Sequence, residues 1–391
     1  MRVAILLHGD VQNDYRVLKT IHSLAKFCEV DLFYISSNVN FIDPFESNEN
    51  INFFPIKRRD SFWQRILRHT LFTHEFNYLI KEVQRSNVVY THIWANDLPT
   101  LVSGVKLAFH FNAKLIYDSH EIYIETLNQF FPRNPSGIKK YIFALLLFLM
   151  KSIGNYFERK SMKKVDCFVT VNKSILEYFH SKYGVSNGVV LMNFPKLNSV
   201  LNDVIDLKKK YSWNENSKVL LYQGVLNEGR GLRLLLNTML ILDGSYKLVL
   251  IGDGTLMKDL VEFCKINNLE QRVKFTGRVS LEDLPQYTKG ADLGVNLLED
   301  FNLSKKMASP NKLFEYIHAD VPVISTNSLE SSKVIDDPRL GRLVDNSIYS
   351  IRNGIYEHFS VAKMKDLDFF ELRKKEYSWE GQEYKLQEIL N

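Results

Sequence analysis

Three glycines and an arginine occupy a short stretch of the sequence that has the chemistry of a phosphate-binding loop. Gly224, Gly229 and Gly231 follow the apolar run 220–223 and precede a helical pattern. Glycine lets the backbone approach a ligand without a Cβ in the way, and the first N–H groups of a helix attract anions. Arg230 adds a fixed cation. The pattern therefore favours phosphate binding, although an ordinary strand–helix turn with a surface arginine has the same sequence.

A second stretch places polar groups at the start of another predicted helix. Ser309 is a suitable N-cap and Pro310 suits the first helical position. Asn311 and Lys312 follow, and Glu315 shares their helix face because residues three and four apart are neighbours. The carboxylate there can accept hydrogen bonds from ribose or sugar hydroxyls while the helix end holds a phosphate. A capped surface helix with one Lys–Glu pair shows the same spacing.

Gly252 and Gly254 follow the apolar run 246–251 in a third loop of the second half. Met257 stands where the third glycine of a dinucleotide-binding motif would lie. The loop therefore favours a structural turn and disfavours a dehydrogenase.

His120 and Glu121 follow the predicted strand 114–118 in the first half. The carboxyl edge of a parallel sheet is where such folds place functional groups, and a histidine there can bond a hydroxyl or hold charge at a reacting centre. A histidine satisfied by a backbone carbonyl is the alternative. The sequence has no HxxxH or HExxH motif and its three cysteines are far apart, so we expect no bound metal and no cofactor.

The elements that must carry these loops alternate between short β-branched runs and helical patterns. The strands read as buried on both faces, which predicts parallel sheets covered by helices, an α/β class with two doubly wound series. The predicted strands are 3–7, 30–35, 88–91, 114–118, 166–171, 189–192, 218–223, 246–251, 272–276, 292–298, 321–325 and 341–344. Predicted helices include 14–27, 98–110, 231–242 and 311–319.

The boundary between the two series is predicted at Pro195. This gives a first domain of residues 1–195 and a second of 196–376. An amphipathic helix over 377–391, anchored by Trp379, Leu386, Ile389 and Leu390, is predicted to pack back on the first domain. Two such domains facing one another would border a cleft, where ligands usually bind.

Composition and charge limit the partners. The chain has 391 residues, 45% hydrophobic and 24% charged, which excludes disorder and a disulfide scaffold. The net charge of +5 is concentrated in residues 1–195, which carry 23 Lys and Arg against 17 Asp and Glu. No arginine cluster is interleaved with aromatics, so nucleic acid is not expected as a partner.

The basic excess is densest at residues 133–164, which have eight Lys and Arg, one acidic residue and the ten-residue apolar run 141–150. A helix in a membrane interface, a helix in the protein core and a dimer contact all fit this segment. The run is shorter than the roughly 20 residues of a membrane span, and the N-terminus lacks a secretory signal. We therefore expect a cytoplasmic protein, with a peripheral contact at the inner membrane face as one interpretation of the segment.

Taken in order along nearly the whole chain, these motifs resemble the family-4 retaining glycosyltransferases of the GT-B fold, the group 1 glycosyltransferases. The matching segments are Asp14-Tyr15-Arg16-Val17, Tyr117-Asp118-Ser119-His120-Glu121, 165–172, Gly224 with Arg230-Gly231, 251–254, 273–279, 310–316 with 322–324, and 377–379.

The resemblance implies a metal-independent hexosyltransferase with a UDP- or GDP-sugar as donor. It implies transfer of a hexose or N-acetylhexosamine to a glycan or lipid-linked acceptor, in bacterial-type surface polysaccharide or glycolipid synthesis. His120, Arg230 and Glu315 would be catalytic: the arginine on the diphosphate, the glutamate on the ribose, and the histidine approaching the sugar from across the cleft. Donor-binding positions would be Gly224, Arg230, Gly252, Gly254, Arg278, Val279, Asn311, Lys312 and Glu315.

Two positions depart from the family pattern. Met307 stands where the family often has an acidic residue that contacts sugar hydroxyls, with Glu299 or Asp300 as substitutes, and Val225 stands where many members have a second diphosphate-binding arginine. Two alternative functions therefore stay open: a nucleotide-sugar 2-epimerase of the same fold, and a non-catalytic nucleotide-sugar-binding partner subunit.

Overall fold

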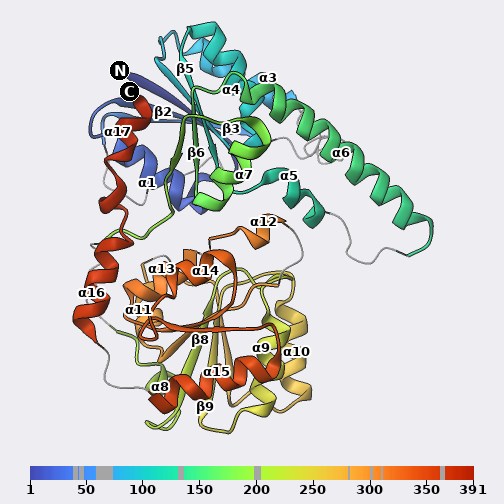
Figure 1. Ribbon diagram of the computed structural model, residues 1–391, viewed down its shortest axis with the longest axis vertical. Helices are drawn as coiled ribbons and strands as arrows, with labels where there is room; N and C mark the ends of the chain where they lie inside the picture. Colours follow the sequence, from blue (N-terminus) through green and yellow to red (C-terminus); the bar gives the residue numbers. More distant parts are fainter. Residues whose placement is uncertain are drawn as a thin grey trace. The chain divides into compact units, whose positions relative to one another are not determined.

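The chain forms two compact units, Met1–Asn193 with Gln382–Asn391, and Phe194–Gly381. Figure 1 traces both in the computed structural model. The structure describes residues 1–37, 43, 48–58, 74–130, 136–197, 204–280, 282–299, 303–309, 311–361 and 366–391. Each unit is described by itself.

The first unit is built on a seven-stranded sheet in the order β3-β2-β1-β4-β5-β6-β7, with every neighbouring pair parallel. The order reverses between β1 and β4, the point at which doubly wound sheets usually bind ligands. The strands are β1 (Arg2–His8), β2 (Glu29–Ser36), β3 (Ile51–Lys57), β4 (His92–Asn96), β5 (Lys114–Ser119), β6 (Cys167–Thr170) and β7 (Gly188–Val190).

Helices connect these strands and cover the sheet. Gly104 of α4 shows how closely one of them packs, because a Cβ there would lie 3.0 Å from side-chain atoms of Ala95 and Leu115. The helices of this unit are η1 (Val11–Asn13), α1 (Tyr15–Leu24), α3 (His74–Arg85), α4 (Asp97–Phe111), α5 (Tyr123–Thr126), η2 (Leu127–Phe130), α6 (Ile138–Met162), α7 (Lys173–Tyr183) and α17 (Lys385–Leu390).

The second unit repeats the plan with a six-stranded sheet in the order β10-β9-β8-β11-β12-β13, again with parallel neighbours. Its order reverses between β8 and β11. The strands are β8 (Lys218–Gln223), β9 (Tyr246–Ile251), β10 (Val273–Gly277), β11 (Leu293–Asn296), β12 (Val323–Thr326) and β13 (Gly341–Val344).

The core of the second unit joins β8 and β9 to helices α9 and α15 through Tyr222, Leu236, Leu248 and Ile351, all fully or almost fully buried. The helices are α8 (Leu207–Lys210), α9 (Leu232–Ile241), α10 (Met257–Ile266), α11 (Leu284–Lys289), α12 (Leu303–Lys306), α13 (Asn311–His318), α14 (Leu329–Val334), α15 (Ile348–Val361), α16 (Leu367–Glu376) and η3 (Glu380–Gln382), whose last residue belongs to the first unit. The predicted α/β class with two doubly wound parallel sheets is confirmed.

Two strands differ from the sequence-based prediction. β3 was not predicted, because Pro55 interrupts its pattern; the strand lies at the edge of the sheet, where a missing N–H is tolerated. The strand predicted at 88–91 is wrong, since none of those residues is in a strand and β4 occupies His92–Asn96. The Thr91 N–H already donates to the Arg2 carbonyl, and pairing with β1 continues from there.

The C-terminal segment was predicted as one helix over 377–391, and this is wrong. The helix α16 ends at Glu376, and after η3 the short helix α17 closes the chain. All four predicted anchors are nevertheless buried. In the first unit, Gln382 accepts from the Met192 N–H, Glu383 pairs with Lys26 of the segment after α1, and Lys385 donates to the Val190 carbonyl.

Candidate functional site

The glycine loop of the second unit follows β8, at the point where the strand order reverses. Gly224 has φ +128°, a left-handed conformation that favours glycine, and its N–H donates to the Ile251 carbonyl. Gly231 also has a positive φ, and a Cβ there would lie 2.4 Å from Cβ of Leu297. The strand β8 and helix α9 therefore meet in a turn that only glycine fits.

Gly252 and Gly254 are needed for packing. A Cβ on Gly252 would lie 2.0 Å from the Gly224 carbonyl oxygen, and one on Gly254 would lie 2.4 Å from the Leu226 carbonyl oxygen. The Gly252 N–H also donates to the Gly277 carbonyl at the end of β10. Three loops at the carboxyl ends of β8, β9 and β10 thus pack backbone against backbone, which accounts for both glycines without a ligand.

Lys312 is the most unusual side chain of this region. The residue is 8% exposed, and its Nζ makes no hydrogen bond within the described part of the chain. The ammonium lies 3.9 Å from the Tyr222 ring centroid and 3.7 Å from the place a Cβ of Gly224 would take. A buried ammonium without an acceptor is costly. Helix α13 therefore aims a buried ammonium at the glycine loop, packed on the face of the Tyr222 ring but without a hydrogen-bond acceptor.

Neighbouring positive charges further destabilise the charged form of Lys312. Burial holds the pKa of its ammonium well below the ordinary value, and Arg230 and Lys305 lower the pKa further, while Glu315 opposes them. Arg230 is half-buried, and the described residues offer it no hydrogen bond or ion pair. Two cations thus act on one another at the glycine loop, an arrangement that an anion would stabilise.

Glu315 lies one turn further along α13. Its carboxylate accepts a hydrogen bond from Nε2 of Gln223, and the other amide atom of Gln223 accepts from the Thr288 hydroxyl. Gln223 is the last residue of β8 and is buried. The strand end therefore fixes the position of Glu315 beside the glycine loop.

The remaining predicted donor positions are placed as follows. Asn311 is exposed at the first position of α13. Arg278 is 79% exposed after β10, with Nε 3.8 Å from the Asp253 carboxylate, and the half-buried Val279 follows it. The structure thus brings Gly224, Arg230, Lys312 and Glu315 together and leaves Arg278 at the surface.

Other residues named in the sequence analysis lie before α13, in the glycine loop or after β11. The Ser309 hydroxyl is buried without a hydrogen-bond partner, so the prediction that it caps α13 is wrong. Met307 is half-buried just after α12, and the Glu299 N–H donates to the Gly229 carbonyl of the glycine loop. Val225 is exposed in that loop. Pro310 and Asp300 lie outside the described residues.

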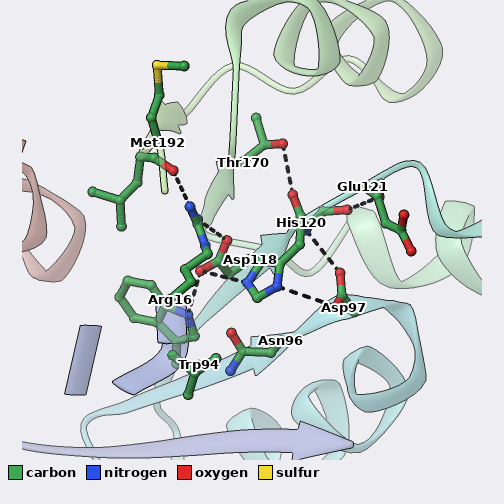
Figure 2. Close-up of polar contacts among 12 residues, drawn as sticks. Arg16, Trp94, Asn96, Asp97, Asp118, His120, Glu121, Thr170 and Met192 are labelled. Atoms are coloured by element: carbon green, nitrogen blue, oxygen red, sulfur yellow. Dashed lines mark hydrogen bonds and ion pairs between the residues drawn. The ribbon is translucent and has the colours of Figure 1, made fainter. Parts of the chain in front are cut away.

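The first unit has its own polar cluster, at the carboxyl ends of β4 and β5 (Figure 2). Asp14 caps α1 by accepting from the Val17 N–H. Two residues later, Arg16 is buried; it pairs with Asp118 at 2.6 Å and donates to the Leu191 carbonyl. Trp94 Nε1 donates to the other oxygen of Asp118 at 3.3 Å. Arg16 therefore fixes Asp118 rather than facing a ligand.

His120 lies between carboxylates in this cluster. Its Nε2 is 3.6 Å from Asp118, and its Nδ1 is 3.6 Å from Asp97 and 4.0 Å from Asp14. These are ion-pair distances, longer than hydrogen bonds. The backbone N–H of His120 donates to Asp97 at 2.9 Å. The alternative of a histidine satisfied by a backbone carbonyl therefore does not hold, since its ring faces carboxylates.

The carboxylates determine the charge of the histidine. Burial would lower the pKa of His120, but Asp97 and Asp118 outweigh burial and raise the pKa to about 9. Burial would raise the pKa of Asp118, yet Arg16 and His120 hold that pKa below its ordinary value. Burial raises the pKa of Asp97, opposed mainly by His120. His120 is therefore an imidazolium at neutral pH.

Sequence reasoning missed Asp97. Asp97 begins α4 with φ +57°, a conformation uncommon outside glycine, and so turns its carboxylate towards His120. The signal is an Asn-Asp pair in which Asn96 ends β4 and Asp97 follows it, at the same sheet edge as His120. Glu121 follows His120, and its carbonyl accepts from the Ser119 hydroxyl. Among the described residues, no group of three or more His, Cys, Asp or Glu side chains is arranged to hold a metal ion.

The comparison with known families matches the second unit, which contains the glycine loop. Residues 217–356 match the family model described as Glycosyl transferases group 1. This part of the chain is similar in sequence to the group 1 glycosyl transferases. The matched residues include the glycine loop, Arg230, Lys312 and Glu315. No curated protein matches the chain by sequence.

Solved structures resemble the whole chain. A sucrose-phosphate synthase from Thermosynechococcus elongatus matches with a TM-score of 0.76 at 15% identity, covering 100% of this chain and 98% of that one. HepE from Anabaena, in complex with UDP-glucose, matches with a TM-score of 0.72 at 15% identity, covering 100% and 99%. A lipopolysaccharide outer core galactosyltransferase, WaaB, matches with a TM-score of 0.65 at 14% identity, covering 100% and 99%. The likeness confirms the predicted GT-B fold.

Proposed function

We propose that this chain is a retaining, family-4 type glycosyltransferase. It would transfer a hexose or N-acetylhexosamine from a UDP- or GDP-sugar to a glycan or lipid-linked acceptor, in bacterial-type surface polysaccharide or glycolipid synthesis. The observation that carries the proposal is the buried ammonium of Lys312, which has no hydrogen-bond partner among the described residues and is aimed at a glycine loop next to Arg230. A diphosphate is an anion of the size and charge that such a loop takes.

The roles of the other residues follow from their chemistry. Glu315, fixed by Gln223, would accept hydrogen bonds from the ribose hydroxyls. The backbone of Asn311 would donate to phosphate, and the main chain of Arg278 and Val279 would bond the base. Because Arg278 is exposed, its side chain contributes less than its main chain. His120 would present a positively charged N–H to the donor sugar.

The reaction would proceed by separation of charge. The bond between the anomeric carbon and the diphosphate oxygen breaks, and negative charge grows on the leaving group, where Arg230 and Lys312 stabilise it without a metal. The acceptor hydroxyl forms the new bond on the same face and gives its proton to the departing diphosphate oxygen. The structurally similar HepE was solved in complex with UDP-glucose, which supports a nucleotide sugar as the ligand class proposed here.

The test is donor binding followed by product analysis. A thermal-shift series with UDP-, GDP- and dTDP-sugars should show one nucleotide stabilising the chain, by about 2.7 kcal/mol at 100 times its dissociation constant. Arg230→Ala and Glu315→Ala should each weaken donor binding about 10-fold or more, since charge-assisted hydrogen bonds are lost.

Arg233→Ala is the matched control. Arg233 lies three residues from Arg230 but already pairs with Glu228 and Asp259, so its loss should leave binding unchanged. Full activity in both site variants would refute the assignment. Conversion of the donor sugar without an acceptor would indicate a 2-epimerase, and tight binding without turnover would indicate a non-catalytic subunit.

A further inference from the structure

Helix α6 exposes an unusual amount of apolar surface. Nine large hydrophobic side chains on this helix are between 38% and 78% exposed. They are Ile138, Tyr141, Ile142, Leu145, Leu146, Phe148, Leu149, Ile153 and Tyr156. Soluble proteins rarely leave so many neighbouring apolar side chains uncovered, and such a patch usually marks an interaction surface.

The spacing of these residues makes them a continuous stripe. At about 100° per residue, all nine positions fall within roughly 160° around the helix axis, so they lie on one side of the helix. The opposite side packs on the first unit: Gly154 lies against Ile124 and Leu98, and Glu158 is buried. We call the exposed side, residues 138–156 as listed above, the α6 stripe.

Positive charge borders the α6 stripe at both ends. Lys139 and Lys140 lie in the first turn, and Arg159, Lys160 and Lys163 lie at the last. All five are exposed, and the described residues provide none of them with a carboxylate partner. The helix's one acidic residue, Glu158, is turned inward, where it accepts from the hydroxyls of Tyr117 and Tyr183. The exposed side is therefore apolar and cationic, with no negative charge of its own.

We propose that α6 docks this protein on an anionic phospholipid bilayer, with the α6 stripe in the interface and the flanking cations on lipid phosphates. Apolar area and attraction to anionic lipids are the two terms that hold an interfacial helix. The helix lies on the membrane rather than crossing it. By length and composition α6 could cross a bilayer, but Gly154, Glu158, Ser161 and Met162 are buried in the first unit.

The length of the unburied part of α6 decides whether the helix lies on the bilayer or crosses it. Residues 138–153, before the first buried residue Gly154, are 16 residues, about 24 Å of helix at roughly 1.5 Å per residue. The hydrocarbon core is about 30 Å thick. A second copy of this chain is the other occupant of such a face, but a two-fold contact would place the same cations against one another.

Vesicle co-sedimentation tests the proposal with no sugar donor present, so its failure would leave the proposed function untouched. The probes are vesicles of phosphatidylcholine alone and of phosphatidylcholine with phosphatidylglycerol. We expect binding to the anionic vesicles only, weakening as salt is raised. Leu145→Glu with Phe148→Glu should reduce binding more than 10-fold, since two apolar side chains leave the interface.

Lys139→Glu with Lys140→Glu separates the charge contribution. At about 1 kcal/mol per lysine, loss of the two cations should weaken binding about 30-fold or more. The matched controls are Phe109→Glu with Ile266→Glu, and Lys209→Glu with Lys258→Glu, all exposed and outside α6. Both controls should bind as the parent does.

Three results would overturn the proposal. The first is no binding to anionic vesicles. The second is an equal loss of vesicle binding in the α6 variants and in their controls. The third is a dimer by light scattering, converted to a monomer by Leu145→Glu with Phe148→Glu, in a protein that vesicles do not bind. The last result would assign the α6 stripe to a second copy of the chain.

Discussion

The charge of His120 can be tested by removing one of its counter-charges. Asp97→Asn is the perturbation, because asparagine keeps the oxygen that accepts from the His120 backbone N–H at 2.9 Å and loses only the negative charge. The charged groups that face His120 come from three elements: Asp14 and Arg16 at the start of α1, Asp97 at the start of α4, and Asp118 on β5. Asp118 remains in the variant, so part of the shift should persist.

The magnitude follows from the distances. One opposite charge within about 4–6 Å shifts a pKa by roughly 1–3 units, and Asp97 lies 3.6 Å from Nδ1. The pKa of His120 should therefore fall from about 9 by roughly one to two units. Each unit corresponds to about 1.4 kcal/mol.

The same shift predicts how stability depends on pH. The folded pKa of about 9 exceeds the ordinary value of 6.5, so the folded state binds the proton more tightly. The stabilisation is complete below pH 6.5 and is lost as pH rises through about 9, a loss of about 3 kcal/mol in total. In Asp97→Asn the loss should be about half as large and should be complete at lower pH.

Two assays read this out. NMR titration of the His120 ring gives the pKa directly, and urea unfolding from pH 6 to pH 10 gives the slope of stability. Glu29→Gln is the control, because this exposed carboxylate pairs with Arg2 in the same unit and lies outside the cluster. If His120 titrates near its ordinary value in the parent, or at an unchanged pH in Asp97→Asn, then the carboxylates do not hold it charged and the reasoning is wrong.

Two further predictions concern the second unit. Gly252→Ala should lower the free energy of unfolding by about 2–4 kcal/mol, because its Cβ would meet the Gly224 carbonyl oxygen at 2.0 Å with φ at +130°. The control is Gly244→Ala, where nothing lies within 4 Å and where stability should change by less than about 1 kcal/mol. Equal effects of the two substitutions in denaturant unfolding would contradict the packing explanation. Lys312→Met should raise the stability of the ligand-free chain by about 1–2 kcal/mol, since a buried cation without an acceptor is removed. The same substitution should abolish stabilisation by the nucleotide sugar that binds the parent. A Lys312→Met variant that is less stable than the parent yet still binds the sugar would show that the lysine has a structural role.

Much of the architecture was predictable because it rests on local patterns. Runs such as Leu248–Ile251 are apolar on successive residues, which is expected only of strands covered on both faces. Where the local pattern is broken, as by Pro55 in β3, the sheet edge makes the break tolerable, and only the tertiary structure shows that β3 is an edge. The C-terminal anchors were predicted as buried, but the break between α16 and α17 was not.

The candidate site was predictable in its residue types and less so in its contacts. The glycine loop and Lys312 are signals within single segments. The roles of Gly252 and Gly254 depend on a neighbouring loop, since their missing Cβ atoms make room for the carbonyls of Gly224 and Leu226. Asp97 likewise acquires its role from β5, because its backbone conformation brings it to a histidine 23 residues away. Contacts across a sheet edge have no fixed sequence spacing, so no periodicity reveals them.

The two clusters handle positive charge in opposite ways, and the contrast indicates what each is built to meet. His120 is a cation whose counter-charges, Asp97 and Asp118, are already in place, so the first unit holds its charge with or without a ligand. Lys312 and Arg230 have no carboxylate at ion-pair distance among the described residues; they act unfavourably on one another, and Glu315 opposes this effect at Lys312. Local instability of this kind is commonly found at functional sites. We therefore expect the compensating anion of the second unit to come from a ligand, and the diphosphate proposed at the glycine loop would supply it.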